Sequence, residues 1–386
     1  MSCERRTSKE VVRAAVDLPV GIPWLTSFYL YLTTGCNLHC QHCWIVPDGN
    51  RDQPYGQAID LDALQSALAE AKPMGLVNIK LTGGEPMLHP RFQDILAMIK
   101  REEFQADMET NGTLITADAA RFIKDHSSIR FVSVSIDSPD REFHDVFRGQ
   151  SGAWEAAVAG INHLLECGIA PQVIMSVSRD NLHMVDDLIR LAIRLRAGSV
   201  KFNPVNSMGR GMEMNRRGRT LDFDEIMALK HRVIHDLQPK VPLPLIILLP
   251  PALMTVGELL ATAMPGGTCS VLNTMGILGS GEYALCGIGQ QYPEMCYGSM
   301  GKDSLREIWL THPAILRLRN GLTDALPDVC NDCVHGPRCI THCAAMNYID
   351  FGTPIHASRY CVEALRKGRF PANRKKRYET GMHPLS

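Results

Sequence analysis

Residues 34–44 read Thr-Gly-Cys-Asn-Leu-His-Cys-Gln-His-Cys-Trp, and this stretch determines how the whole chain is interpreted. Its cysteines, Cys36, Cys40 and Cys43, follow a C-x3-C-x2-C spacing. A cubane 4Fe–4S cluster has four irons, and each iron normally takes one thiolate. Three cysteines in one short loop can bind three irons and leave the fourth without a protein ligand. Such an open iron can bind a small molecule and pass it an electron, whereas a fully liganded cluster only relays electrons.

Zinc is the competing metal for this loop. Structural zinc sites usually have four ligands, often supplied by paired C-x2-C segments. His39 and His42 lie between and beside the cysteines and could complete such a site. The simpler interpretation of both histidines is packing and hydrogen bonding to a cluster sulfur. The spacing favours iron–sulfur over zinc, and the rest of the chain adds to that preference.

Length and composition are those of a globular protein. The chain has 386 residues, of which 45% are hydrophobic and 21% charged, and its formal net charge of -1 gives no reason to expect nucleic acid as a partner. The first ten residues are charged and lack an apolar core, so we expect a cytoplasmic protein without a secretory signal. Residues 241–254 are apolar but short for a membrane span and contain four prolines, which predicts a buried strand with turns and no membrane contact.

The thirteen cysteines indicate metal rather than disulfides. In a reducing compartment, clustered cysteines usually bind metal. Ten of the thirteen fall into spaced groups, and Cys3, Cys167 and Cys296 stand outside them. Cys167 precedes a glycine at the end of a predicted helix, where a structural role is the ordinary outcome.

Strand-like and helix-like stretches alternate from residue 27 to residue 205. This alternation predicts an α/β fold with a parallel sheet, in the form of a partial (β/α)6 TIM-like barrel. In such folds function lies at the carboxyl ends of the strands, and the first strand runs directly into the three-cysteine loop. We expect strands at 28–32, 78–81, 106–109, 131–136, 172–177 and 199–202, and helices at 61–71, 91–99, 117–124, 153–167, 184–195 and 223–237.

A second motif, Gly83-Gly84-Glu85-Pro86, follows the second predicted strand. The two glycines let a ligand approach the backbone closely. Unpaired backbone groups at a strand end can bind a charged amino or carboxylate group. Alone this motif could be an ordinary turn, but its position one βα unit after the cysteine loop gives it more weight.

The three-cysteine loop followed by Gly83–Pro86 resembles the radical S-adenosylmethionine (radical SAM) enzymes. In that family the open iron binds the amino and carboxylate groups of S-adenosylmethionine, and the reduced cluster cleaves this cofactor to a 5′-deoxyadenosyl radical that abstracts a hydrogen from the substrate. The resemblance implies that Gly83, Gly84, Glu85 and Pro86 hold the methionine amino group. It also implies weaker assignments, because short polar strand ends occur in any α/β protein: Thr110, Ser135 and Asp137 would help to hold methionine and ribose. Asn203 or Arg210, after the sixth strand, could contact cofactor or substrate.

The later cysteines resemble the SPASM extension of these enzymes, which carries two auxiliary iron–sulfur clusters of the 4Fe–4S type. The resemblance implies one cluster on Cys330, Cys333, Cys339 and Cys361, and another on Cys269, Cys286 and Cys343. Many family members have one more cysteine shortly after the first of these, and this chain does not. The second cluster would therefore have an open iron or take Cys296 as its fourth ligand. A zinc ribbon over residues 330–343 is the alternative.

The resemblance divides the chain into four parts: an N-terminal extension (1–26), a radical SAM core (27–238), a loop-rich, iron–sulfur-stapled SPASM domain (239–365) and a basic C-terminal tail (366–386). Metal can replace a large apolar core in such a loop-rich domain. The tail carries seven lysines and arginines, and we expect it to be a solvated segment or a contact for an acidic partner.

The implied function is an oxidoreductase that matures a ribosomally made peptide by an oxidative cross-link or a related modification. An external electron donor of the flavodoxin or ferredoxin type would be needed. Residues 1–26 are too few for a separate peptide-binding domain, so a leader peptide would be recognised by a partner protein or by the barrel edge. A small molecule such as a tetrapyrrole is the alternative substrate. A non-catalytic electron carrier is a third possibility, but it would need neither an open iron nor the Gly-Gly-Glu-Pro segment.

Overall fold

A computed structural model describes residues 17–49, 52–261, 270–323 and 326–376. The chain forms two compact units. The first comprises residues 1–247 and 270–315, and the second comprises residues 248–269 and 316–386. Cys3 and Cys269 lie outside the described residues.

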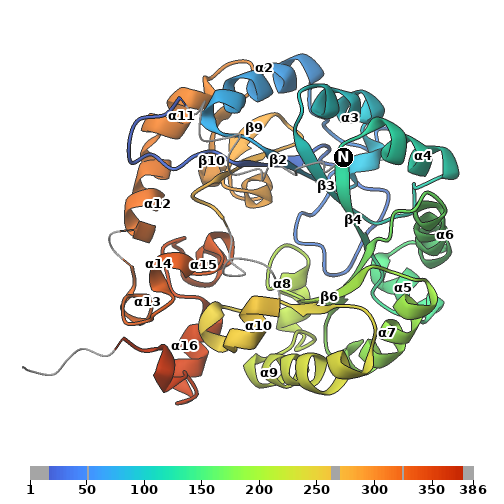
Figure 1. Cartoon of the computed structure of the whole chain (residues 1–386), viewed down its shortest axis with the longest axis vertical. Helices are drawn as coiled ribbons and strands as arrows, with labels where there is room; N and C mark the ends of the chain where they lie inside the picture. The colour runs from blue at the N-terminus through green and yellow to red at the C-terminus, as the bar shows by residue number, and fades with distance from the viewer. Residues whose placement is uncertain (1–16, 50–51, 262–269, 324–325, 377–386) are drawn as a thin grey trace, which may run out of the picture. The chain divides into compact units, whose positions relative to one another are not determined.

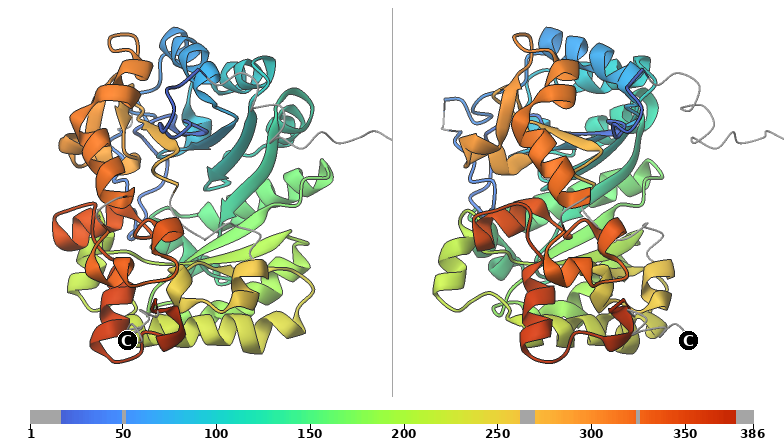
Figure 2. Two further views of the ribbon diagram at one scale, coloured as in Figure 1. Left: turned by 60° about the vertical axis from the view of Figure 1, so that its left-hand side comes forward. Right: turned by 90° about the vertical axis from the view of Figure 1, so that its left-hand side faces the viewer.

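The first unit is built on a sheet of ten strands in the order β10-β9-β8-β1-β2-β3-β4-β5-β6-β7. The six predicted strands are present in chain order, side by side and parallel (Figures 1 and 2). They are β1 (Ser27–Tyr31), β2 (Asn78–Thr82), β3 (Gln105–Thr110), β4 (Ile129–Ser135), β5 (Gln172–Val177) and β6 (Ser199–Pro204).

The sheet is larger than the six strands that the sequence predicts. β7 (Leu245–Ile247) pairs with β6 in parallel and accounts for the apolar stretch at 241–254. At the other edge β8 (Thr274–Ile277) is parallel to β1, and β9 (Glu282–Ala284) and β10 (Cys296–Ser299) continue the sheet in antiparallel fashion. Residues 270–315 therefore belong to the same compact unit as the βα part. The family boundary near residue 239 stays a prediction.

Side-chain alternation gives the sheet two different faces. Buried apolar residues such as Ile79 and Val134 define the outer face, and helices α3, α6 and α7 pack against strands of the sheet (Figure 1). Half-buried polar residues such as Lys80 and Lys201 define the inner face. A strand that alternates in this way has one face toward a core and one toward solvent or ligand.

The predicted helices of the first unit are confirmed, with ends shifted by a few residues. Several begin with an aspartate or threonine whose side chain accepts from a backbone amide of the first turn, which is the usual N-cap. They are α2 (Leu61–Ala71), α3 (Phe92–Arg101), α4 (Ala117–His126), α6 (Ala153–Glu166), α7 (Val185–Arg194) and α9 (Phe223–His231), the last continued by a π-helix (Arg232–Leu237).

Further helices in the chain were not predicted. The most important is α5 (Arg141–Arg148), which begins at the N-cap Asp140 and ends at Gly149 with φ 69°. The others are α8 (Gly211–Arg216), α10 (Val256–Ala261), α11 (Leu305–Thr311), α12 (Pro313–Thr323), α13 (Asp328–Asn331), α14 (Gly336–Cys339), α15 (Ala344–Phe351) and α16 (Arg359–Arg366). Short 3-10 turns lie at Lys72–Met74, Pro86–Leu88, Leu182–Met184, Gln238–Lys240, Pro251–Leu253, Gly287–Gln290, Pro293–Met295 and Ala372–Arg374.

The second unit consists of short helices and loops, as expected. Its basic tail bonds to the second unit through the backbone at residues 374–376, while most of its described side chains are exposed. The expectation of a solvated segment stays a prediction. Lys375 forms an antiparallel bridge with Cys333, and the Val334 amide donates to the Arg374 carbonyl at 2.8 Å. The Arg374 guanidinium donates to the Met254 carbonyl at 2.8 Å. These bonds fix the end of the described chain beside the C-x2-C turn. Across the described ranges, every helix is too short or too polar to cross a membrane.

Candidate iron–sulfur centre

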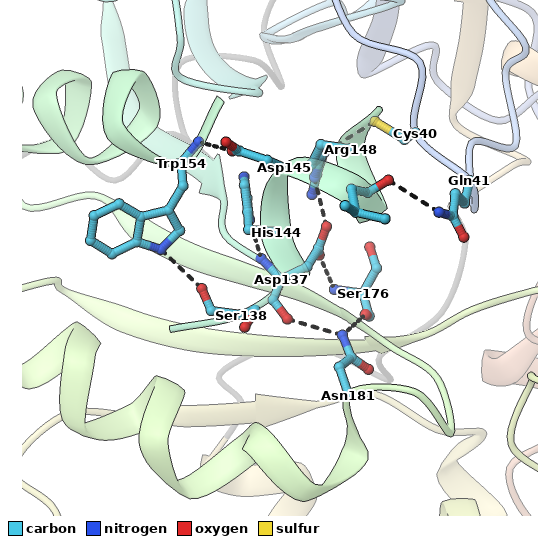
Figure 3. A network of polar contacts seen from close by, with 11 residues as sticks. Cys40, Gln41, Asp137, Ser138, His144, Asp145, Arg148, Trp154, Ser176 and Asn181 are labelled. Carbon is cyan, nitrogen blue, oxygen red and sulfur yellow. Dashed lines mark hydrogen bonds and ion pairs between the residues drawn. The ribbon is translucent and has the colours of Figure 1, made fainter. Parts of the chain in front are cut away.

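The cysteine loop is attached to the end of helix α5. The last carbonyls of a helix have no partner within the helix, and here the loop supplies their donors. The His39 amide donates to the Arg148 carbonyl at 3.0 Å, and the Gln41 amide donates to the Phe147 carbonyl at 2.9 Å. The Gln41 side chain adds a bond of 3.1 Å to the Val146 carbonyl (Figure 3). Backbone bonds therefore position the loop that carries the three thiols.

Two thiols of this loop, Cys36 and Cys40, need a compensating positive charge to ionise. Burial, together with the nearby Glu85, Cys40 and Cys43, raises the pKa of Cys36 to about 12. Burial also raises the pKa of Cys40, against the lowering effect of the Arg148 guanidinium. Iron supplies such a charge, because thiolates are the ligands of iron–sulfur clusters.

N–H groups point at the sulfurs of this loop. Cys36 Sγ accepts from the Leu38 amide at 3.4 Å and from Asn111 Nδ2 at 3.8 Å. Cys40 Sγ accepts from Arg148 Nη1 at 3.8 Å (Figure 3). Hydrogen bonds to sulfur are among the features that set the potential of an iron–sulfur cluster. The donor set therefore fits a cluster at this position.

The spacing of the thiols also bears on the choice of metal. Within the described ranges, no three histidine, cysteine or carboxylate side chains converge on one point as a single metal ion requires. A cubane instead distributes its thiolate ligands over different irons. The ligand role of Cys36, Cys40 and Cys43 stays a prediction.

Gly84 has a structural reason to be glycine. A Cβ atom there would lie 1.7 Å from the Gly35 carbonyl oxygen. The Glu85 amide donates to that same Gly35 oxygen at 3.0 Å, and the Gly84 amide donates to the Thr33 carbonyl at 3.2 Å. The end of β2 is thereby joined to the start of the cysteine loop, so the two predicted cofactor segments lie together.

The side chain of Glu85 is fully buried and already bonded. Its Oε1 accepts from the Thr110 hydroxyl at 2.7 Å, and its Oε2 accepts from the Asn111 amide at 2.8 Å. Burial raises the pKa of Glu85 to about 7. The hydroxyl of Thr110 is therefore committed to Glu85, and the geometry does not favour its expected direct contact with methionine. The backbone of Gly83–Pro86 remains the part that would meet the cofactor.

Asp137 forms the centre of a buried polar network (Figure 3). Its Oδ2 accepts from Arg148 Nε at 2.6 Å, and its Oδ1 accepts from the Ser176 amide at 2.8 Å. Asn181 Nδ2 donates to the Asp137 carbonyl at 3.0 Å. Burial alone would raise the pKa of Asp137, but the Arg148 guanidinium holds it below its usual value. The network connects β4, α5 and β5 to Cys40, which accepts from the same guanidinium.

Ser135 and Asp137 therefore play different parts. The carboxylate of Asp137 is 0% exposed and fully bonded, so the geometry favours support of the site over direct ribose contact. Ser135 is half-buried, and its hydroxyl makes no hydrogen bond to any described residue. It remains available for a ligand at the end of β4. Both cofactor roles stay predictions.

Arg148 is a site residue that the sequence did not single out. It is the last residue of the unpredicted helix α5. Asn111 lies in the segment Glu109-Thr110-Asn111-Gly112, which the family resemblance implied as a whole, and its cofactor role stays a prediction. The sequence does contain a local signal for the helix that ends at Arg148. Asp140 is a residue that can cap its start, and Gly149 is a residue that can end it.

The surroundings of Cys43 are aromatic. The rings of Tyr31 and Trp44 meet edge to face with centroids 6.2 Å apart, and both pack in the hydrophobic cluster that includes Cys43. His42 stacks on Phe147 at 4.6 Å, and burial lowers the pKa of His42 to about 4. The packing role expected for this histidine fits the structure.

Arg210 contacts the cysteine loop itself. Its Nη1 donates to the Cys40 carbonyl at 3.2 Å, and its amide donates to the Cys43 carbonyl at 2.9 Å. The loop after β6 therefore helps to hold the cysteine loop, and its expected contact with cofactor or substrate stays a prediction.

Four cysteines of the second unit lie close together. Burial, together with the nearby Cys330 and Cys333, raises the pKa of Cys339 to about 12. Burial and these same three cysteines raise the pKa of the Cys361 thiol. The His335 amide donates to Cys333 Sγ at 3.4 Å. Cys330, Cys333, Cys339 and Cys361 thus interact electrostatically with one another. Their role as ligands of one auxiliary cluster stays a prediction.

The ligands expected for the other auxiliary cluster are dispersed over the chain. Burial, and not a neighbouring cysteine, raises the pKa of Cys343. Cys286 belongs to the first unit, and Cys269 lies outside the described residues. Cys296 begins β10 and directs its thiol to the Gly289 carbonyl at 3.6 Å. This ligand set, and the choice between an open iron and Cys296, stay predictions.

Comparison with known proteins agrees with the site. Residues 30–192 match the Radical SAM superfamily. The chain contains a radical SAM domain. This radical SAM domain includes β1 to β5 and helix α5, and thus all three cysteines of the loop.

Three relatives match different shares of the chain. The AdoMet-dependent heme synthase of Nitratidesulfovibrio vulgaris is 35% identical over 166 residues, which are 43% of this chain and 44% of that protein. The subtilosin biosynthesis protein AlbA of Bacillus subtilis is 26% identical over 239 residues, 62% of this chain and 52% of AlbA. The AdoMet-dependent heme synthase of Methanosarcina barkeri is 26% identical over 347 residues, 86% of this chain and 94% of that protein. The chain spans about half the length of the first two relatives.

A solved structure confirms the fold class. Streptococcus suis SuiB bound to precursor peptide SuiA matches with a TM-score of 0.68 at 15% identity, over 88% of this chain and 76% of SuiB. This similarity shows the fold alone, and it confirms the partial barrel and the cysteine-rich C-terminal region that the sequence predicts.

Proposed function

We propose that this protein is a radical SAM oxidoreductase that matures a ribosomally made peptide. The observation that carries the proposal is the joining of two segments in the first unit. The three-thiol loop after β1 and the glycine-dependent turn after β2 are bonded to each other through Gly35. This juxtaposition is the one that a cluster with a bound S-adenosylmethionine needs.

The roles of the residues follow from their geometry. When bound, the cluster and S-adenosylmethionine would supply a radical able to remove a hydrogen atom from the substrate. Cys36, Cys40 and Cys43 would hold three irons. The backbone of Gly83–Pro86 would accept the methionine amino group. The packing of Tyr31 on Trp44 would limit the access of water to the cluster.

The later cysteines, which lie in both units, support an oxidative reaction. Cys330, Cys333, Cys339 and Cys361 would hold an auxiliary 4Fe–4S cluster, and Cys269, Cys286 and Cys343 would hold a second one. Auxiliary clusters suit reactions that must remove an electron after the substrate radical has formed. An external flavodoxin- or ferredoxin-type donor would reduce the first cluster, and a separate leader-peptide-binding protein could present the substrate.

Two named relatives support a peptide substrate. AlbA is a subtilosin biosynthesis protein, and SuiB was solved with a precursor peptide. A tetrapyrrole is the second candidate substrate, because the match to the Methanosarcina barkeri heme synthase spans 94% of that protein. The oxidation of a peptide is the proposal that the fold and the auxiliary cysteines together support.

The test uses anaerobically reconstituted protein. We expect iron to approach about twelve atoms per chain and the reduced protein to release 5′-deoxyadenosine from S-adenosylmethionine. Changing all three loop cysteines to alanine should abolish this release and leave most of the remaining iron. Mass spectrometry of a co-expressed precursor peptide then reports the modification, and incubation with iron coproporphyrin tests the tetrapyrrole alternative. Unchanged cleavage in the triple variant would contradict the proposal.

A further inference from the structure

Three charged side chains lie on the inner face of the sheet, outside the Gly83–Pro86 turn that is predicted to hold the cofactor. They are Lys80 on β2, Glu109 on β3 and Lys201 on β6. Lys80 Nζ lies 2.6 Å from Glu109 Oε1, and these side chains are 26% and 34% exposed. Lys80 Nζ also lies 5.3 Å from the centroid of the Tyr29 ring. Lys80 is therefore held in place by an ion pair and an aromatic ring.

Lys201 lacks such a partner. It is half-buried, and its ammonium makes no hydrogen bond or ion pair with any residue that the structure describes. It is near enough to the pair to interact with both members electrostatically. Burial lowers the pKa of Lys201, while Glu109 raises it and Lys80 lowers it. Lys201 Nζ is not among the buried nitrogens that lack a partner in the described residues, so water can solvate it. An anionic ligand can replace that water and form a charge-assisted hydrogen bond.

The rest of the inner face does not provide that partner. Arg130 Nη2 bonds to Asp107 at 3.2 Å and to Asn78 at 2.8 Å, so this pair is neutral in itself. Gln172 Nε2 donates to the Ser199 hydroxyl at 2.9 Å. The neighbouring polar groups thus satisfy one another. The group of Lys80, Glu109 and Lys201 keeps one uncompensated positive charge.

The strand register places Lys201 in line with the predicted cofactor site. Lys201 pairs with Ile174 on β5, and Ile174 pairs with Ser135 on β4. Two strand spacings separate Lys201 from Ser135, which corresponds to about 10 Å between their Cα atoms. Ser135 has the free hydroxyl at the end of β4. A substrate group bound at Lys201 would therefore lie next to the region where the cofactor is expected.

We propose that Lys201, beside the Lys80–Glu109 ion pair, binds a carboxylate group of the substrate. This proposal rests on the proposed function and names a chemical property of its substrate. A carboxylate would give the Lys201 ammonium a charge-assisted hydrogen bond. Glu109 is already bound to Lys80, so it does not compete at short range. A neutral amide of the same shape would leave the charge uncompensated and bind more weakly.

The carboxylate can come from two sources. In a peptide it would be an aspartate or glutamate side chain near the modified residue, and in a tetrapyrrole it would be a propionate. We test both with the anaerobically reconstituted full chain. One probe is a pool of decapeptides containing Asp and Glu, compared with an identical pool containing Asn and Gln. The other is coproporphyrin III, compared with its tetramethyl ester.

Binding is measured by ultrafiltration and mass spectrometry for peptides and by absorbance for porphyrins. We expect the wild type to prefer the acid form of a probe over its neutral form. K201M should lower affinity for the acid form at least about tenfold, and E109Q should raise it, because the net positive charge of the group then increases by one. K302M alters an exposed lysine outside the inner face and should bind like the wild type. Iron content and the thermal midpoint check that each variant is folded.

The outcomes separate the two proposals. Lys201-dependent preference for acidic peptides supports the carboxylate site with a peptide source. Lys201-dependent preference for free coproporphyrin supports the site and assigns it to a tetrapyrrole. The carboxylate site is overturned if the wild type binds acid and neutral probes equally. It is also overturned if wild type, K201M and E109Q all show the same preference for the acid form. No turnover is needed, so failure to cleave S-adenosylmethionine would count against the proposed function and leave this binding result intact.

Discussion

At the scale of single residues, the buried pair of Asp137 and Arg148 is the most consequential interaction of the described site. Both side chains lie away from water, with exposures of 0% and 8%. A buried ion pair is costly to break, because the remaining partner is left charged and unpaired. The same guanidinium also points at Cys40, so the pair affects both the stability and the electrostatics of the cysteine loop.

R148M should therefore lower the free energy of unfolding by about 3 to 5 kcal/mol. D137N should cost a similar amount, and the double variant should cost less than the sum of the two, since neither charge is then left alone. Anaerobic thermal or chemical denaturation measures these changes. R190M, which removes the exposed pair of Arg190 with Asp187, is the matched control and should cost less than about 1 kcal/mol. If R148M and R190M lost equal amounts of unfolding free energy, the stabilising role of the buried Asp137–Arg148 pair would be contradicted.

The pH dependence of stability should reveal Glu85. Its pKa is raised from 4.5 to about 7 in the folded state. The folded state therefore holds a proton that the unfolded state has lost, and the stability present below pH 4.5 is lost as pH rises through 7. Between pH 5 and pH 8 the free energy of unfolding of the wild type should fall by about 3 kcal/mol more than that of E85Q. Denaturation of both proteins at the two pH values gives this difference, and parallel pH profiles would show that Glu85 titrates normally.

At the scale of elements, the turn after β2 and the cysteine loop act as one unit. The Cβ of an alanine at position 84 would be placed 1.7 Å from the Gly35 oxygen, so the backbone would have to move. G84A should reduce the iron bound by the loop and weaken S-adenosylmethionine binding. Iron analysis and equilibrium dialysis measure both. G257A, where the nearest atom lies at 4.0 Å, should leave both unchanged, and normal iron content in G84A would show that the turn tolerates a side chain.

The strands and most helices could be predicted because hydrophobic periodicity is a local property. The period of two in β2 and the apolar stripe of α7 are visible in the sequence alone. Helix α5 was missed because its eight residues, Arg-Glu-Phe-His-Asp-Val-Phe-Arg, are mostly polar. The strands β8 and β9 were missed because they are short and take their place from pairing, β8 with β1 and β9 with β8.

Residues of the candidate site could be predicted only where they belong to a sequence motif. The three loop cysteines and Gly83–Pro86 have characteristic spacing, so they were found. Arg148 gains its role from Cys40, 108 residues away in sequence. Lys201 gains its role from Lys80 and Glu109 on other strands. Such tertiary partners leave no periodic signal, and a polar residue near a strand end looks the same with or without them.

At the scale of the whole molecule, the last described residues stabilise the second unit. Lys375 bridges to Cys333 and Arg374 bonds to Met254. A chain ending at residue 370 should therefore lose about four irons, the content of one cubane, and unfold at a lower temperature. A chain ending at residue 376 keeps these bonds and should match the full-length protein. Iron analysis of both truncations checks the prediction, and equal iron in the two would show that the bridge is dispensable.

The attachment of the cysteine loop to helix α5 has a consequence for assembly. Amide-to-carbonyl bonds fix the backbone of this loop, and none of them involves metal. A zinc finger, in contrast, orders its ligands only when the ion arrives. Free iron and sulfide, or a scaffold protein that delivers them, would thus meet thiols whose backbone is already arranged. Oxygen that destroys the inorganic core would leave behind a polypeptide ready to be loaded again.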